Sequence, residues 1–152
     1  MSKRNRKIVA LTSATLALAM IALIMTPAYA YGMWNFDYDT GDYIYIEAGV
    51  AGNYNQGKLY SPAAYIKATI LEDLPLDYVL VIYWRFEWTD VNHVLHVQYD
   101  TEDLPGYHYQ GQTKRIEPTG LPYVVYDIVA EGRAGYDGIW DTDLVCASLP
   151  WL

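Results

Sequence analysis

Cysteine is almost absent from this chain, since Cys146 is the only one among 152 residues. A single cysteine excludes an intrachain disulfide, so a folded domain has to be stabilised by its hydrophobic core. Cys146 lies in the apolar stretch 144–147, which predicts a buried and unreactive thiol. An intermolecular disulfide is the other use open to this residue.

Basic residues are also scarce once the first 30 positions are set aside. Residues 31–152 contain six Lys and Arg against 18 Asp and Glu, which gives a net charge of −12. Nucleic-acid binding needs clustered cations that displace counterions from phosphates, so this charge balance excludes it as a function class. The same balance argues against binding to anionic membrane surfaces.

Groups that carry out catalysis are few and badly placed. The only serines after residue 30 are Ser61, which precedes a proline, and Ser148, which lies in an apolar stretch. His93 and His96 fall in a predicted strand at a spacing that points them to opposite faces, which is unsuited to zinc binding. With no nucleophile–base pair and no phosphate-binding glycine loop, the sequence predicts a protein that is not an enzyme.

The first 30 residues have the three parts of a secretory signal peptide. A basic cluster at 3–7 precedes an apolar run at 8–25, and Ala28-Tyr29-Ala30 supplies small residues at a cleavage site. We therefore expect cleavage after Ala30, contact with the membrane only during export, and a secreted or cell-surface location. A retained membrane anchor is the alternative, because 18 apolar residues approach the length that spans a bilayer.

The remaining 31–152 form one domain by length, and its pattern is that of strands. The residues from Tyr78 to Trp88 alternate with period two and predict a central strand whose core face carries Trp84. Further strands are expected at 43–51, 63–71, 91–99, 107–116, 121–131 and 144–149, with a turn at 52–57. Without any sustained helical period, the expected class is all-β, a single antiparallel β-sandwich of jelly-roll type. Residues 31–41 read as a separate opening strand that could detach.

Two short loops contain alternating acidic residues and are candidates for calcium, the only cofactor we expect. Oxygen-rich loops of this kind bind hard cations, although neither follows the twelve-residue EF-hand pattern. Solvated acidic turns are the simpler interpretation, because Asp is common in turns. The six candidate ligands are Asp37, Asp39, Asp42, Asp137, Asp141 and Asp143.

Aromatic residues are abundant, with 15 Tyr, five Trp and two Phe after residue 30. Many fall in predicted loops or polar strands, so they cannot all belong to the core, and exposed aromatic patches mark binding surfaces. The candidate binding residues are Met33, Trp34, Phe36, Tyr54, Tyr60, Tyr107, Tyr109, Tyr136 and Trp140.

Two functions fit these observations. The first is a structural protein of the cell exterior, a subunit of a filament, surface layer or matrix. Its copies would assemble when the opening strand of one adds to the sheet edge of another. The second is a secreted carbohydrate- or protein-binding module that uses the aromatic side chains as stacking platforms.

Overall fold

The computed structural model of the protein describes residues 31–150 as an all-β structure of antiparallel strands, which confirms the predicted class. The predicted signal peptide at 1–30 lies outside the described residues. The strands in chain order are β1 (Tyr31–Thr40), β2 (Ile44–Asn55), β3 (Lys58–Ile70), β4 (Leu80–Asp90), β5 (Leu95–Leu104), β6 (Thr113–Ile116), β7 (Val124–Tyr136), β8 (Ile139–Trp140) and β9 (Val145–Leu149). Residues 31–150 include no helix that could cross a bilayer.

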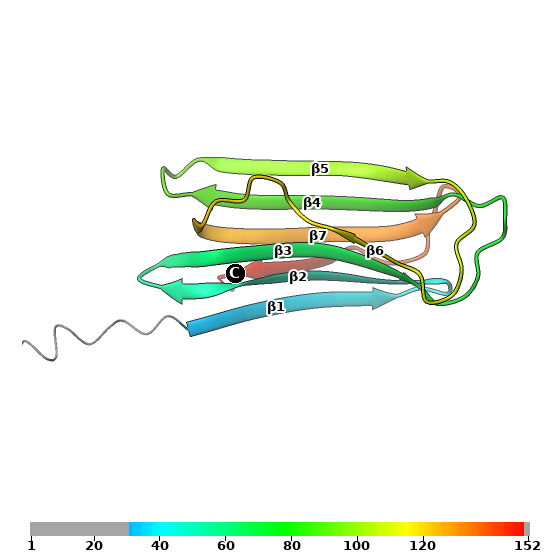
Figure 1. The fold of residues 1–152 in the computed structure, drawn as a ribbon, viewed down its shortest axis with the longest axis horizontal. Helices are drawn as coiled ribbons and strands as arrows, with labels where there is room; N and C mark the ends of the chain where they lie inside the picture. The colour runs from blue at the N-terminus through cyan, green and yellow to red at the C-terminus, as the bar shows by residue number, and fades with distance from the viewer. Residues whose placement is uncertain (1–30, 151–152) are drawn as a thin grey trace, which may run out of the picture.

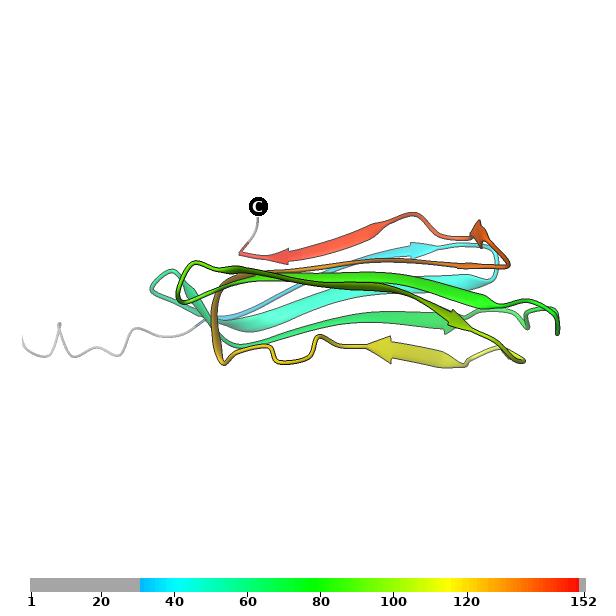
Figure 2. The same cartoon turned by 90° about the horizontal axis from the view of Figure 1, so that it is seen from above.

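The strands are connected by hydrogen bonds in the order β1-β2-β3-β7-β4-β5, and β1 and β5 lie at opposite margins of this path (Figure 1). Strands β3 and β7 pair only at one end, through Leu59–Val125 and Tyr60–Val124. Beyond that point β6 pairs with β3, while β8 and β9 pair with β7. In Figure 2, β9 and β6 lie on opposite sides of the strands between them.

The core lies between the part of the sheet around β2 and β3 and the part around β4 and β7. Strand β2 contacts β7 and β9 without pairing with either, so the sheet folds over on itself. Ile46, Ile66, Ile82, Phe86 and Ile128 have no exposed surface. Because hydrogen bonds join all nine strands into one sheet, the two separate sheets of a sandwich or jelly roll stay a prediction.

Strand β4 lies where the period-two pattern predicts it. Leu80, Ile82, Phe86 and Trp88 are buried on one face, and Trp84 on the same face is half-buried against the core. Its indole Nε1 is enclosed without a hydrogen-bond partner among residues 31–150. The prediction that this face points into the core is therefore confirmed.

One predicted turn and two predicted strands were wrong in extent. The turn expected at 52–57 is only Gln56-Gly57, with φ of 48° and 76°, because these left-handed residues close a two-residue hairpin between paired Asn55 and Lys58. The strand expected at 91–99 begins at Leu95, and His93 lies in the preceding turn with φ of 62°. The strand expected at 107–116 is confined to β6.

The prediction of a buried Cys146 was also wrong. Val145, Ala147 and Leu149 of β9 point into the core, so Cys146 projects from the other face and is exposed. Partial desolvation and the nearby carboxylates of Glu131 and Asp37 raise the pKa of its thiol, which disfavours the reactive thiolate.

Candidate functional site

The opening segment 31–41 forms a regular strand rather than a loose tail. Strand β1 pairs with β2 of the same chain from Tyr31–Tyr54 to Thr40–Tyr45. No strand among residues 31–150 pairs with its other edge, so β1 is an edge strand with an open side. Whether this strand can detach stays a prediction.

Alternation along β1 divides its side chains between two faces. On the inner face, Asn35 Nδ2 donates to the Ser148 carbonyl at 3.2 Å, and the Asp37 and Asp39 carboxylates accept hydrogen bonds from the amides of Cys146 (2.9 Å) and Asp143 (2.7 Å). These side chains occupy backbone groups on the edge of β9 that β7 leaves open. Strand β1 therefore also protects the edge of β9.

The outer face of β1 carries a row of stacked rings that we call the aromatic ladder: Trp34, Phe36 and Tyr38, continued by Tyr45 of β2. Successive ring centroids are 5.4, 6.2 and 5.8 Å apart, and the planes diverge by 10°, 22° and 29°. Trp34, Phe36 and Tyr38 are 65%, 45% and 57% exposed. Three large side chains on one open strand therefore form a continuous apolar strip facing solvent.

A polar cluster adjoins the ladder on β2, β3 and β6. Glu47 accepts hydrogen bonds from the hydroxyls of Tyr45, at 2.8 Å, and Tyr65. The Arg115 guanidinium lies 3.9 Å from the centroid of the Tyr65 ring. That ring covers Gly49, where an added Cβ would collide with it, so a larger residue there would displace the Tyr65 ring.

Burial and the contacts within this cluster shift the pKa values of its two tyrosines and its glutamate. Burial raises the pKa of Tyr45 and of Tyr65 to about 12, with the hydrogen bonds to Glu47 acting in the same direction. Burial alone would raise the pKa of Glu47, but the bonds from both tyrosines and the charges of Lys67 and Arg115 outweigh it and lower that pKa. Glu47 is therefore held as a carboxylate that links β2 to β3.

The predicted binding residues do not form one surface. Trp34 and Phe36 belong to the ladder, whereas Met33 and Tyr54 pack against the core. Tyr107 and Tyr109 are exposed in the loop before β6, and Tyr60 contacts Tyr123. Tyr136 packs between Tyr43 and Tyr78, and Trp140 lies under Arg133.

The prediction omitted Tyr38, Tyr45, Tyr65 and Arg115, which complete the ladder and the polar cluster. The period-two spacing of Trp34, Phe36 and Tyr38 is a signal that could have identified the exposed row. The contribution of Tyr45, Tyr65 and Arg115 depends on strand pairing, which no local pattern contains.

The two acidic loops meet in space although they are about 100 residues apart in sequence. The Asp141 carboxylate accepts hydrogen bonds from the backbone amides of Asp42 (3.1 Å), Tyr43 (2.9 Å) and Ile44 (2.8 Å). The Asp39 carboxylate already accepts from the amide of Asp143. Within residues 31–150, no group of three or more acidic, His or Cys side chains has metal-binding geometry, so calcium stays a prediction.

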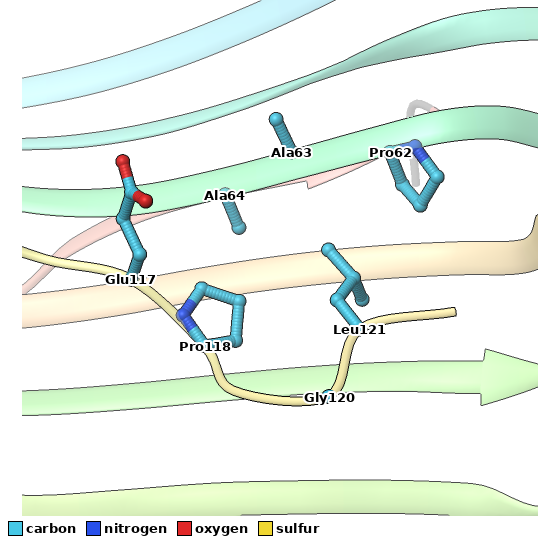
Figure 3. A pocket seen from close by; sticks show the side chains of 7 residues that line it. All are labelled: Pro62, Ala63, Ala64, Glu117, Pro118, Gly120 and Leu121. Atoms are coloured by element: carbon cyan, nitrogen blue, oxygen red, sulfur yellow. The ribbon is translucent and has the colours of Figure 1, made fainter. Parts of the chain in front are cut away.

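Two hollows open beside β3. One, of about 340 Å³, opens between β3 and the loop 117–121 and is lined by Pro62, Pro118, Leu121 and small residues, with Glu117 as its one charged group (Figure 3). The other, of about 220 Å³, is flanked by Trp34, Phe36, Tyr65 and Arg115. Neither combines an enclosed cavity with converging catalytic groups.

Comparison of the chain with models of protein families, with curated proteins and with solved structures finds no match.

Proposed function

We propose that this protein is a secreted, non-enzymatic structural subunit of the cell exterior. Its copies associate through the open edge of β1 into a filament, surface layer or matrix. The observation that carries the proposal is the aromatic ladder on a ten-residue edge strand whose outer side is open. Such an edge presents free backbone groups beside an apolar strip, which is a template for pairing with another chain.

The magnitudes favour association through the whole edge rather than through the rings alone. Full burial of one large apolar side chain is worth about 1.5–3 kcal/mol. The three rings are only about half exposed in the subunit, so covering them supplies roughly 2.5–5 kcal/mol. Association costs about 4–15 kcal/mol in lost translational and rotational freedom. The rings therefore offset part of this cost, and backbone pairing along β1 has to supply the rest.

The stacking of the rings bears on the choice between a protein partner and a sugar. A sugar packs on the free face of an aromatic ring, but Phe36 lies between Trp34 and Tyr38, and Tyr38 lies between Phe36 and Tyr45. The ladder thus exposes mainly ring edges. A row of ring edges suits burial under a second protein surface better than sugar stacking.

A polysaccharide-binding module is the second candidate, and the hollow beside the ladder favours it. Trp34 has one face free of ring neighbours, and Arg115 and Tyr65 flank the same hollow. A sugar unit placed there would contact the free face of Trp34 and the polar groups of Tyr65 and Arg115, and such a module would remain monomeric.

The test is electron microscopy of the exported protein, residues 31–152, across a range of protein and salt concentrations. We expect fibres or regular arrays from the wild type and monomers from the variant Trp34→Ser/Phe36→Ser at an unchanged melting temperature. Leu76→Ser/Tyr123→Ser is the matched control, because it removes two exposed apolar side chains outside β1 and should assemble normally. A wild type that stays monomeric and is retained on a glycan matrix would contradict the proposal and support the second candidate.

A further inference from the structure

The margin of the sheet opposite β1 has a second open edge, formed by β5. Strand β5 pairs with β4, and no strand within residues 31–150 pairs with its other side. Leu95, Val97 and Tyr99 alternate along it and are 59%, 42% and 70% exposed. Resting on the proposed function, we propose that β1 of one copy pairs antiparallel with β5 of the next copy and continues the sheet from subunit to subunit.

The topology gives the two edges the correct relative direction. Every pairing on the path β1-β2-β3-β7-β4-β5 is antiparallel, so directions alternate across six strands and β5 runs opposite to β1. A copy translated across the sheet would therefore place its β1 antiparallel to the first copy's β5. Both strands have ten residues, and Figure 1 shows them at opposite margins of the molecule.

The backbone hydrogen bonds determine which residues point their amides outward. The Gly41 amide donates to the Ile44 carbonyl, so the odd-numbered residues of β1 direct their backbone amides and carbonyls toward β2. The backbone amides and carbonyls of Trp34, Phe36 and Tyr38 therefore point away from β2. The Asp90 amide donates to the Val94 carbonyl, and by the same alternation Leu95, Val97 and Tyr99 turn away from β4. The residues with free backbone groups are thus the ones that carry the two apolar strips.

Local side chains occupy two of these outward amides in the isolated chain. The Tyr38 amide donates to Asp37 Oδ1 at 3.0 Å, and the Thr101 amide donates to Asp100 Oδ1 at 2.7 Å. These bonds agree with the alternation derived above, because an amide paired with a strand would not be available to its neighbour's side chain. The two carboxylates would release these amides when a strand docks.

One register matches both strips along their whole length. It places Trp34 opposite Tyr99, Phe36 opposite Val97, and Tyr38 opposite Leu95. On the other face it places Asn35 opposite Gln98 and Asp37 opposite His96. These polar side chains already have hydrogen-bond partners within their own subunit, so the apolar strips determine the register. No acidic residue of β1 then faces an acidic residue of β5, because Asp100 falls opposite Met33 and Asp39 falls opposite Val94.

Because the two surfaces differ, the contact is heterologous, and an untwisted repeat does not close into a ring. Each added subunit docks through one edge and presents the other, so one end of the assembly always has an open β5 edge and the other end an open β1 edge. The product is an open-ended assembly.

The register is tested by a disulfide between subunits. In the background Cys146→Ser, the variant Gly32→Cys/Thr101→Cys places two cysteines opposite each other in this register, at outward positions outside the two apolar strips. Their Cα atoms would lie at the separation of about 5.5 Å that hydrogen-bonded strand pairs have. We expect oxidation of assembled protein to give a ladder of covalent oligomers on denaturing gels. The control Gly32→Cys/Leu76→Cys, with the second cysteine at an exposed position outside β5, and Gly32→Cys alone should give no species larger than a dimer.

A second variant tests the β5 edge without a disulfide. Val97→Pro removes an amide that points away from β4, so the intrachain pairing of β5 stays complete while docking is blocked. We expect it to stay folded by circular dichroism and to stay monomeric by sedimentation velocity. If the wild type assembles, but Val97→Pro assembles equally and the 32–101 cysteine pair gives no oligomers, the partner edge is wrong and the structural function stands. If the wild type never assembles, both proposals fail.

Discussion

At the residue scale, Glu47 shows how a charge is stabilised beside an aromatic surface. Its two carboxylate oxygens accept hydrogen bonds from Tyr45 on its own strand and Tyr65 on the next, while Lys67 and Arg115 supply positive charge. The bonds fix the rings of both tyrosines, and the Tyr65 ring closes over Gly49. The polar cluster therefore orders the surface on which the last ring of the ladder lies.

This cluster predicts a dependence of stability on pH. The pKa of Glu47 is lower in the folded protein than in the unfolded chain, so its contribution is present above the ordinary value near 4.5 and is lost as the pH falls through the folded value. In urea unfolding between about pH 5 and pH 3, the wild type should lose more stability than Glu47→Gln. Parallel curves for the two proteins would show that Glu47 is not stabilised as proposed.

Tyr45 and Tyr65 predict a loss of stability at alkaline pH. Their pKa values, raised to about 12, mean that the contribution is complete below pH 10 and is lost as the pH rises through about 12. Absorbance at alkaline pH should show late-titrating tyrosine in the wild type, and this component should be smaller by two tyrosines in Tyr45→Phe/Tyr65→Phe. An unchanged titration in the variant would contradict the contacts to Glu47.

Packing at β4 gives a prediction about stability. Phe86 has no exposed surface, so Phe86→Ala should reduce the free energy of unfolding by about 3–5 kcal/mol. Trp84 on the same face is half-buried and has an unpaired indole nitrogen, so we expect a smaller loss from Trp84→Ala. Denaturant unfolding with Leu76→Ala as an exposed control checks the order. A larger loss at Trp84 than at Phe86 would mean that the ring lies deeper than described.

Substitution of Asp141 distinguishes a structural role of the acidic loops from a role in calcium binding. Because its carboxylate accepts hydrogen bonds from three backbone amides, Asp141→Ala should reduce the free energy of unfolding by about 2–3 kcal/mol in the presence of a chelator. Asp143 is the control, since its side chain makes no hydrogen bond within the described range, and Asp143→Ala should leave the melting temperature nearly unchanged. A melting temperature raised by millimolar calcium, with the gain lost in Asp143→Ala, would instead establish the cation site.

At the element scale, the local sequence pattern was enough to locate individual strands. The alternation from Tyr78 to Trp88 located β4 and its core face, and the apolar run near Val145 located β9. The same reasoning misplaced Cys146, because burial depends on which alternate residues of β9 face the core. It also extended the turn at 52–57, since Asn53 and Asn55 resemble turn residues although pairing with β3 keeps them in a strand.

Contacts between distant segments lay beyond local pattern altogether. The bond from Asn35 to Ser148 and the capping of the 42–44 amides by Asp141 join residues about 100 positions apart. They hold the opening strand and the turn after it against the C-terminal part of the chain. The grouping of Trp34, Phe36 and Tyr38 could be predicted from spacing, but their union with Tyr45, Tyr65 and Arg115 could not.

Hydrogen exchange tests the open edges of the individual strands. Outward amides of β1 and β5, such as those of Phe36 and Val97, have no strand partner in one subunit and should exchange quickly in dilute protein. Amides in the pairing of β4 with β7 should exchange slowly under all conditions. On assembly, the outward amides should become protected. Protection of these amides already in the monomer would contradict an open edge.

At the scale of the whole molecule, the net negative charge opposes the self-association that the open edges favour. Residues 31–152 carry a net charge of −12, so copies repel one another over distances that shorten as salt rises. Apolar strips and free backbone groups act only at contact. Self-association should therefore strengthen with ionic strength, whereas an assembly stabilised mainly by ion pairs would weaken.

Sedimentation velocity on residues 31–152, at rising protein concentration in low and high salt, tests self-assembly through the β1 edge most directly. The account predicts growth from monomers to large species, stronger at high salt, and a monomer throughout for Trp34→Ser/Phe36→Ser. A single monomeric boundary for the wild type under every condition, or equal growth of the ladder variant, would contradict it.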